Sequence, residues 1–317
     1  MNRTLPLGSL IVALLCNVAA ATALRIEATI PLGAVAGRID HLGVDVDRKR
    51  LFVAELVDNR VAVVDIATRT VTRTIDHLAE PQGVAYESTT DTLYVTNGGD
   101  GSVRLYSAAT FDSIGRIELH DDADNVRIDA ANHRVLVGYG NGLAVIDPRT
   151  HALRTYALDG HPEAFQVEPS TARVLVNVPH VHAVVALDTK GHATRRPIPV
   201  PGSNYPLAID DRNQLVLPLR HPAKLLVMHD RRTSTAELCD DADDAFVDAR
   251  RQRLYVSCGD GHLDVFERRG ASYARIDRVA TAQGARTSLF VAAWDRLYLA
   301  VPASADAPAA VWVMKPE

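Results

Sequence analysis

Leu93-Tyr94-Val95 is one of seven copies of a short apolar segment that recurs along the chain. Successive copies start 42, 42, 39, 41, 39 and 43 residues apart. A period of about forty residues is typical of one four-stranded blade of a β-propeller. The sequence therefore predicts an all-β fold, a seven-bladed β-propeller. The copies are Leu51-Phe52-Val53, Leu93-Tyr94-Val95, Val135-Leu136-Val137, Val174-Leu175-Val176, Leu215-Val216-Leu217, Leu254-Tyr255-Val256 and Leu297-Tyr298-Leu299.

Each repeat has the same internal order. A turn-like run such as Asp47-Arg48-Lys49-Arg50 precedes the apolar segment, which predicts a hairpin between a first and a second strand. A polar or Gly/Pro-rich loop then leads to a run such as Val61–Asp65, in which the enrichment of valine predicts a third strand. A second turn leads to a run such as Val71–Ile75, which predicts an outer strand. In most repeats an acidic residue lies six positions before the apolar segment: Asp45, Glu87, Asp129, Glu168 and Asp248.

The two ends of the chain complement each other. Val311-Trp312-Val313-Met314 predicts the third strand of the last repeat, and the sequence ends at Glu317 with no outer strand after it. Residues 25–32 predict an outer strand with no repeat before it. We expect the N-terminal strand to complete the last blade and close the ring, which leaves only short strand edges exposed.

Tyr94-Val95-Thr96-Asn97, followed by a Gly-rich turn and another apolar strand, resembles the signature of the YVTN-repeat β-propeller family. Tyr255-Val256-Ser257-Cys258 is a degenerate copy. The resemblance covers nearly the whole chain after the N-terminal segment and implies a bacterial exported seven-bladed propeller of the YncE-like group. It implies no single activity, because such proteins include binding proteins, exported proteins of unknown role and enzyme-like relatives.

The first 23 residues have the features of a secretory signal peptide. Arg3 supplies the positive start, Leu10–Leu15 the apolar centre, and Ala21-Thr22-Ala23 a small-residue cleavage site. A lipid anchor on Cys16 is the competing reading, but Leu15 stands where a small residue is needed. We therefore expect residues 1–23 to be a signal peptide, residues 24–317 to form one propeller domain, and the protein to be periplasmic or secreted.

Composition limits the partners. The formal net charge is −5, and the charges are interspersed without a basic stripe that could follow a phosphate backbone. Nucleic acid is therefore not expected as a partner. After residue 23 no apolar stretch is long enough to span a bilayer, so the mature chain is predicted to have no transmembrane segment. We also expect the mature protein to be a monomer.

Cys239 and Cys258 are the only cysteines after the predicted cleavage site. An exported protein meets an oxidising compartment, which favours a disulfide between them. Their expected positions at strand ends of neighbouring blades, on the same face of the ring, agree with this pairing. The alternative is two unrelated thiols. A metal site made by these thiols alone is disfavoured, because neither lies in a Cys-x-x-Cys pair.

The loops that lead into the innermost strands of a propeller converge on the central channel, where ligands usually bind. Alignment of the repeats places one polar residue per blade five positions before the acidic residue; we call this set the mouth ring. Two positions earlier lies a second ring, from which Arg38 and His161 are further ligand-binding candidates. The mouth ring consists of Asp40, Gln82, Asp124, Glu163, Tyr205, Asp243 and Arg286. The second ring consists of Arg38, Glu80, Asp122, His161, Ser203, Asp241 and Gly284.

Polar groups at a concave mouth favour ligand binding. The carboxylates Asp40, Asp124, Glu163 and Asp243 suit a hard cation, an amine or a sugar, and calcium is the metal that such oxygen ligands prefer. His161 and Glu163 are the candidate catalytic residues, because an imidazole and a carboxylate at a channel mouth can exchange protons near neutral pH. The alternative is a solvent-filled polar mouth without a ligand, in which water molecules form the hydrogen bonds of these groups.

The motifs of common enzymes are absent from the sequence. It contains no Gly-x-Ser-x-Gly, no His-Glu-x-x-His and no Gly-x-x-x-x-Gly-Lys. This absence favours an exported propeller that binds a small molecule, a cell-surface component or a protein at the channel mouth. The alternative is an enzyme at the same mouth, a metal-assisted hydrolase of the lactonase type or a lyase. A structural platform for protein–protein contacts is a third possibility.

Overall fold

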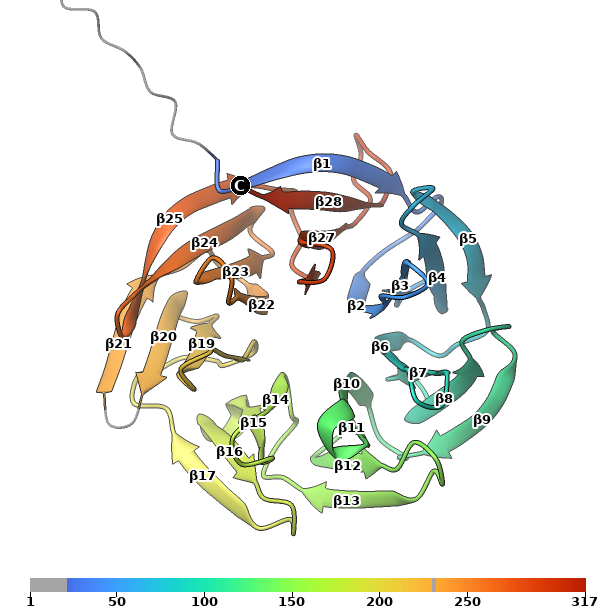
Figure 1. Ribbon diagram of the computed structural model, residues 1–317, viewed down its shortest axis with the longest axis horizontal. Helices are drawn as coiled ribbons and strands as arrows, with labels where there is room; N and C mark the ends of the chain where they lie inside the picture. Colours follow the sequence, from blue (N-terminus) through green and yellow to red (C-terminus); the bar gives the residue numbers. More distant parts are fainter. Residues whose placement is uncertain (1–21, 230–231) are drawn as a thin grey trace, which may run out of the picture.

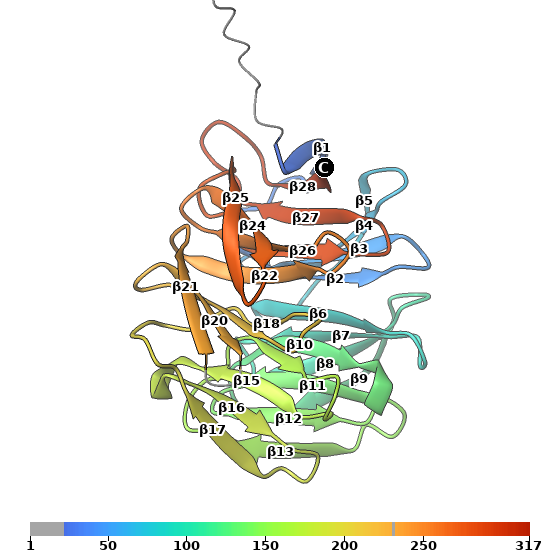
Figure 2. The same ribbon diagram turned by 60° about the vertical axis from the view of Figure 1, so that its left-hand side comes forward.

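The computed structural model describes residues 22–229 and 232–317, and these form seven four-stranded antiparallel sheets arranged as a ring (Figure 1). The predicted seven-bladed β-propeller is confirmed. Each sheet runs from an inner strand near the axis to an outer strand at the rim, as the order β26, β27, β28, β1 in the last blade illustrates (Figure 2). Cys16 and the first 21 residues of the predicted signal peptide 1–23 lie outside the described residues.

The first four blades follow the chain in order. Blade 1 consists of β2 (Ile39–Asp45), β3 (Arg50–Glu55), β4 (Arg60–Asp65) and β5 (Thr70–Ile75). Blade 2 consists of β6 (Pro81–Glu87), β7 (Thr92–Asn97), β8 (Ser102–Ser107) and β9 (Ser113–Glu118). Blade 3 consists of β10 (Ala123–Asp129), β11 (Arg134–Tyr139), β12 (Gly142–Ile146) and β13 (Leu153–Ala157). Blade 4 consists of β14 (Phe165–Val167), β15 (Val174–Val178), β16 (Ala183–Leu187) and β17 (Ala193–Pro197).

The remaining blades continue the ring, and the last one takes its outer strand from the start of the chain. Blade 5 consists of β18 (Ala208–Ile209), β19 (Leu215–Leu219), β20 (Lys224–His229) and β21 (Arg232–Glu237). Blade 6 consists of β22 (Ala242–Asp248), β23 (Arg253–Cys258), β24 (His262–Arg269) and β25 (Ser272–Ala280). Blade 7 consists of β26 (Ser288–Val291), β27 (Arg296–Val301), β28 (Ala310–Pro316) and β1 (Leu24–Pro31).

Helical structure in residues 22–229 and 232–317 is limited to two single 3-10 turns, η1 (Ala130–Asn132) and η2 (Pro179–Val181). Across the same residues, we find no helix with the length and apolar character that a membrane crossing requires.

The N-terminal strand closes the ring as the sequence predicts. β1 pairs antiparallel with β28, from Leu24 opposite Pro316 to Pro31 opposite Ala310, with one irregularity near Ile26. The two strands lie side by side at the rim (Figure 1). The closure joins the two ends of the sequence, because the outer strand at the N-terminus and the inner three strands at the C-terminus make one sheet.

The hydrophobic core lies between neighbouring blades. Because side chains alternate along a strand, each second strand sends residues to the blade on either side. In β3, Leu51 and Val53 pack against blade 7, whereas Phe52 packs against blade 2. The same arrangement recurs around the ring, so every blade interface has its own cluster of buried apolar residues.

The recurring acidic residues have a structural role at the first hairpins of the blades that carry them. Glu87 is buried and accepts hydrogen bonds from the backbone N–H groups of Thr89 and Thr90 at 3.0 and 2.8 Å. These bonds satisfy backbone N–H groups of the turn that have no partner in the strand pairing. Blade 5 uses Asp210 in the same way, one position off the alignment, since its oxygen accepts from the N–H groups of Arg212 and Gln214.

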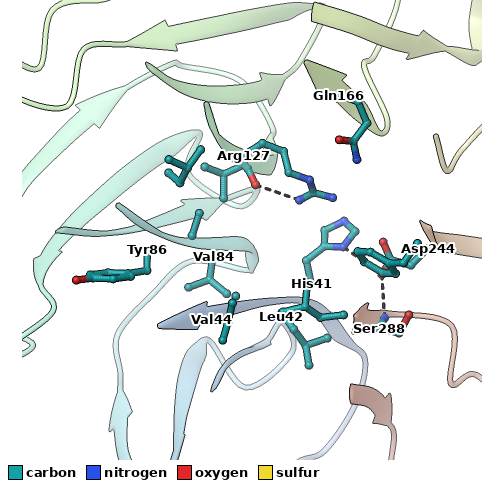
Figure 3. A pocket seen from close by; sticks show the side chains of 15 residues that line it. His41, Leu42, Val44, Val84, Tyr86, Arg127, Gln166, Asp244 and Ser288 are labelled. Carbon is teal, nitrogen blue, oxygen red and sulfur yellow. Dashed lines mark hydrogen bonds and ion pairs between the residues drawn. The ribbon is translucent and has the colours of Figure 1, made fainter. Parts of the chain in front are cut away.

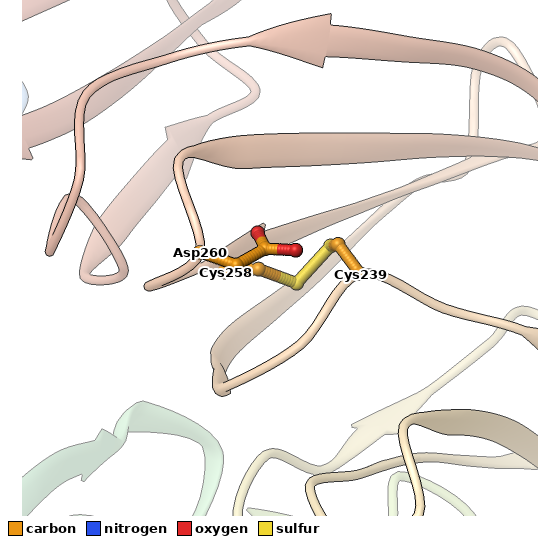
Figure 4. Close-up of side chains that lie close together, drawn as sticks. All are labelled: Cys239, Cys258 and Asp260. Carbon is orange, nitrogen blue, oxygen red and sulfur yellow. A yellow bond between two sulfur atoms is a disulfide. The ribbon is translucent and has the colours of Figure 1, made fainter.

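A disulfide joins Cys239, just after β21, to Cys258, the last residue of β23. The two Cα atoms are 5.9 Å apart, and both residues are buried. The carboxylate of Asp260 lies beside the bridge (Figure 4). The bond links blade 5 to blade 6 on the face where the second strands end.

Candidate functional site

The mouth ring lies where the inner strands depart from regular pairing. In β2, Ile39 is opposite Glu55 and Leu42 is opposite Val53, so this strand carries one extra residue. The inner strands of blades 2, 3 and 6 are irregular at the same position. Such a bulge re-aims side chains. The bulge in β2 allows two successive residues, Asp40 and His41, to face the axis. Asp40 interacts with acids of other blades, and His41 lines the channel.

Loops that follow the second strands complete this face of the ring. The N–H groups of Gly98, Gly140 and Gly259 donate to the carbonyl groups of Glu80, Asp122 and Asp241 at 2.9, 2.8 and 2.9 Å. In blade 5 the N–H of Arg220 donates to Ser203 at 2.9 Å. Four second-ring residues thus hold the loops through their backbone. The contact in blade 5 also brings the side chain of Arg220, which the sequence reasoning missed, to the mouth.

On one side of the mouth, three acids each contact a different side chain: Arg38, Gln82 or His161. Nη2 of Arg38 lies 2.8 Å from Oδ2 of Asp40, whose side chain is only 1% exposed. Nε2 of Gln82 donates to Oδ1 of Asp122 at 2.6 Å, which joins blades 2 and 3. Nε2 of His161 lies 3.4 Å from Oδ2 of Asp124, and its Nδ1 lies 2.9 Å from the carbonyl oxygen of Gly140.

Two arginines cross-link the acids on the other side. Arg220 pairs with Asp243, and its guanidinium lies 3.7 Å from the ring centroid of Tyr205. Arg286 places Nη1 2.8 Å from Oδ2 of Asp241 and Nε 3.2 Å from Oδ2 of Asp243. Asp243 is thus held by two guanidinium groups. Tyr205, an uncharged member of the mouth ring, supports one of them by a cation–π contact.

Glu163 differs from the other mouth-ring acids. Within residues 22–229 and 232–317, no basic nitrogen lies within the 4.0 Å of an ion pair with its carboxylate. Burial raises the pKa of Glu163 to about 7, and the negative charge of Asp124 adds to the effect. The result is a carboxyl group at the mouth whose pKa is near 7 and which has no ion-pair partner within 4.0 Å among the described residues.

The surroundings in the channel shift the pKa values of neighbouring groups in opposite directions. Burial raises the pKa of Asp40 above its ordinary value. Burial also acts on Asp124, but the hydrogen bond with His161 and the charge of His41 outweigh it and hold the pKa of Asp124 low. In return, the hydrogen bond with Asp124 raises the pKa of His161 to about 9. The charges of His161 and Glu163 influence each other, so the mouth combines an imidazole that stays protonated near neutral pH with a carboxyl whose pKa is near 7.

The four carboxylates proposed for calcium do not form a compact cluster. In the part of the chain that the structure describes, only Cys239, Cys258 and Asp260 bring three potential ligand atoms within 4.8 Å of one another. Asp40, Asp124 and Asp243 each pair with a base instead, and a calcium ion needs six to eight oxygen ligands. Calcium therefore stays a prediction, without a preformed cage of these side chains.

A second group of polar residues lies deeper in the channel. His41, Arg127, Gln166 and Asp244 line a cavity of about 390 Å³ together with apolar side chains of the inner strands (Figure 3). The imidazole of His41 lies between two acids, 3.8 Å from Asp40 and 3.7 Å from Asp244. Burial lowers the pKa of His41, but these charges outweigh it and raise the pKa to about 9. The sequence feature that could have identified these residues is the presence of charged residues inside otherwise apolar inner strands.

Comparison with known proteins shows the fold. No protein-family model and no curated protein sequence matches the chain. The structure resembles virginiamycin B lyase from Staphylococcus aureus with a TM-score of 0.76 and 9% sequence identity, over 93% of this chain and 100% of that chain. It resembles Kuenenia stuttgartiensis hydrazine synthase with a TM-score of 0.73 and 15% identity, over 84% of this chain and 95% of that chain.

A chain of a mitotic checkpoint complex is similar to the same degree, with a TM-score of 0.77 and 12% identity over 98% of both chains. Proteins with such different titles share this architecture, and the identities are low. These likenesses therefore show a seven-bladed β-propeller and leave the function to the residues of the site. The YVTN-repeat resemblance of Tyr94-Val95-Thr96-Asn97 stays a prediction.

Proposed function

We propose that the protein binds a small organic molecule with a basic nitrogen at the channel mouth. The observation that carries the proposal is the carboxyl group of Glu163, which has no counter-charge among the described residues, whereas Asp40, Asp124 and Asp243 each have a base within 4.0 Å. An ammonium or guanidinium group of a ligand would supply the missing charge and a charge-assisted hydrogen bond.

The rest of the mouth suits the remainder of such a ligand. Gln82 comes from blade 2, Tyr205 and Arg220 from blade 5, and Arg286 from blade 7, so the mouth presents donors, acceptors and an aromatic face without symmetry. An asymmetric lining favours an asymmetric organic ligand over a bare ion. Calcium is the alternative ligand of the same carboxylates. A cell-surface component or a protein side chain that carries an amine would use the same contacts.

Calorimetric titration of the mature protein tests the proposal. The probes are a panel of primary amines and amino sugars, the neutral alcohols of matching shape, and calcium chloride. We expect an amine to bind and Glu163→Gln to weaken it by about tenfold or more, as loss of a hydrogen bond to a charged group does. The control is Glu118→Gln, which removes an exposed carboxylate on β9 that is paired with Arg116.

Equal binding by the wild type and Glu163→Gln would place the site elsewhere. Binding of calcium with loss in both Glu163→Gln and Asp243→Asn would support the metal instead. If neither amines nor calcium bind, the proposal fails and the protein–protein platform becomes the better interpretation.

An enzyme at the same mouth is the second candidate, favoured by one observation. His161 is held as an acid by Asp124, while Glu163 beside it titrates near 7, the range in which a general base works best. This pair suits proton abstraction by Glu163 and protonation of a leaving group by His161, the chemistry of a lyase or a hydrolase. Product formation from the amine found by titration tests it. His161→Gln is then expected to lower kcat more than it weakens binding.

We also propose that the protein is exported and periplasmic or secreted. The support comes from the first 23 residues of the sequence, with a basic residue at Arg3, the apolar run Leu10–Leu15 and the small residues Ala21-Thr22-Ala23 before the predicted cleavage site. Mass spectrometry of the exported protein is expected to give an N-terminus at or near Leu24. A diacylglycerol adduct on Cys16 would contradict this.

A further inference from the structure

The cavity of about 390 Å³ in the channel is separate from the mouth. None of the seven mouth-ring residues lines it; its walls come from positions one to four residues further along the inner strands. They reach Val44, Tyr86 and Ile128, which directly precede the acids of the first hairpins. The cavity therefore extends toward the opposite face of the ring, with a volume in the range of small-molecule sites, about 300–1,000 Å³.

Arg127 and His41 are the basic groups of this cavity, and Arg127 has no ion-paired carboxylate among the described residues. Its Nη1 donates to Oδ1 of Asn125 and to the carbonyl of Val126 at 3.0 Å. Among the described residues, no carboxylate oxygen lies within 4.0 Å of its guanidinium, although Arg38, Arg220 and Arg286 all have one. Nη2 and Nε of Arg127 thus keep their hydrogens available to the cavity.

Two neighbours point into the same space. Figure 3 shows the guanidinium of Arg127, the amide of Gln166 and the imidazole of His41 turned toward one another across the cavity. In the described part of the chain, the Gln166 amide makes no hydrogen bond within the 3.5 Å limit. The charge of His41 is shared between Asp40 and Asp244, which leaves Arg127 as the positive charge that a ligand can compensate.

The other walls of the cavity are apolar. They include Val44, Val84, Ile128, Phe246 and Leu289, contributed by the inner strands of blades 1, 2, 3, 6 and 7. A charged group among apolar walls is complementary to an amphipathic molecule.

We propose that this cavity is a second binding site, for a small amphipathic molecule with one carboxylate. The carboxylate would accept two parallel hydrogen bonds from Nε and Nη2 of Arg127, the geometry that arginine favours. The Gln166 amide would donate a third, and the hydrocarbon part would pack on the apolar walls. A dianion such as phosphate is less suitable, because Asp244 lines the same cavity and only one guanidinium is free to balance the charge.

Calorimetry with octanoate, octan-1-ol and octylamine tests this proposal, because the three probes share a chain and differ in charge. We expect octanoate to bind with one molecule per chain and more tightly than the other two. Arg127→Gln is expected to weaken octanoate binding by about ten- to a hundredfold, the range for a hydrogen bond to a charged group, and to leave octan-1-ol unaffected.

A second variant covers the case in which Arg127→Gln fails to fold. Ala85→Leu fills part of the cavity wall and leaves the guanidinium in place, so it is also expected to abolish octanoate binding while its circular dichroism stays that of the wild type. Glu163→Gln separates this site from the mouth, since it should leave octanoate binding unchanged whatever it does to amine binding.

The proposal is overturned if octanoate does not bind at millimolar concentration, if octylamine binds the cavity more tightly, or if folded Ala85→Leu and Arg127→Gln bind octanoate as the wild type does. Loss of octanoate binding in Glu163→Gln together with unchanged binding in Arg127→Gln would assign the carboxylate to the mouth instead.

Discussion

Replacing Ile30 by alanine tests how strongly the N-terminal strand closes the ring. Ile30 on β1 is fully buried, and it packs in the cluster that joins blade 7 to blade 1, with Tyr298 and Val311 from one side and Leu51 from the other. Deleting the buried methyl and methylene groups of an isoleucine costs about 2–5 kcal/mol, because a cavity remains in a core that relaxes only in part. Total stabilities are only about 5–15 kcal/mol, so this is a large fraction.

The same strand offers a matched control. Ile26 is 42% exposed on the outer side of β1, so Ile26→Ala removes the same atoms from the same strand without opening a cavity in the core. Its effect is expected to stay within about 0.5 kcal/mol. The difference between the two variants therefore measures the packing of the closure rather than the strand propensity of isoleucine.

Urea denaturation provides the assay, followed by tryptophan fluorescence and circular dichroism. Both tryptophans belong to the closing blade: Trp312 lies on β28, and Trp294 lies in the turn before β27 and packs against the same cluster as Ile30. Fluorescence thus reports on blade 7, whereas circular dichroism reports on all blades. We expect the two transitions to coincide and Ile30→Ala to shift both. Equal stabilities of Ile30→Ala and Ile26→Ala would refute the closure argument.

Three further predictions concern the channel and the bridge. Glu163→Gln should raise the melting temperature at pH 8 but not at pH 4. Burial raises the pKa of Glu163 from 4.5 to about 7, so between these values the folded state keeps a proton that the unfolded chain has lost. The stability of the wild type therefore falls as pH rises across that interval, and the variant avoids this loss. A pH-independent difference would contradict this. Asp124→Asn should lower the pKa of His161 from about 9 toward 6.5, measured by NMR titration of the imidazole; an unchanged pKa would show that Asp124 is not its cause. Cys239 and Cys258 are 19 residues apart, and replacing both by serine should lower the free energy of unfolding, measured by urea denaturation, by about 3 kcal/mol. Alkylation of both thiols in the native, oxidised wild type would contradict the existence of the disulfide.

The fold followed from local features of the sequence. The apolar segment of each second strand, exemplified by Leu93-Tyr94-Val95, is buried on both faces in the structure, and its seven-fold recurrence sets the number of blades. Even the closure was readable, because residues 25–32 and Val311–Met314 are the two incomplete parts of one sheet. The one hairpin acid that the alignment missed, Asp210, belongs to the repeat whose spacing is irregular.

The site was only partly readable. Alignment of the repeats placed Asp40, Asp124 and Asp243 at one mouth, since a repeat position becomes a circle around the axis when the blades close. It did not identify Arg220, which comes from a loop after a second strand rather than from the aligned position. Nor did it identify His41, because strict alternation would turn this residue away from the axis that its neighbour Asp40 faces, and the bulge in β2 is set by pairing with β3.

The sequence by itself thus determined the number of blades, their internal order and the strand that closes the ring, because these depend on periods and alternation within one or two repeats. The tertiary structure decided which charges meet. The pairs Asp124 with His161 and Asp243 with Arg220 join side chains of neighbouring blades, 37 and 23 positions apart in the sequence. Glu163 and Arg127 have no oppositely charged partner within 4.0 Å among the described residues. These relations are fixed only when the blades close around a common axis, and burial there, rather than sequence spacing, shifts the pKa values of the buried groups.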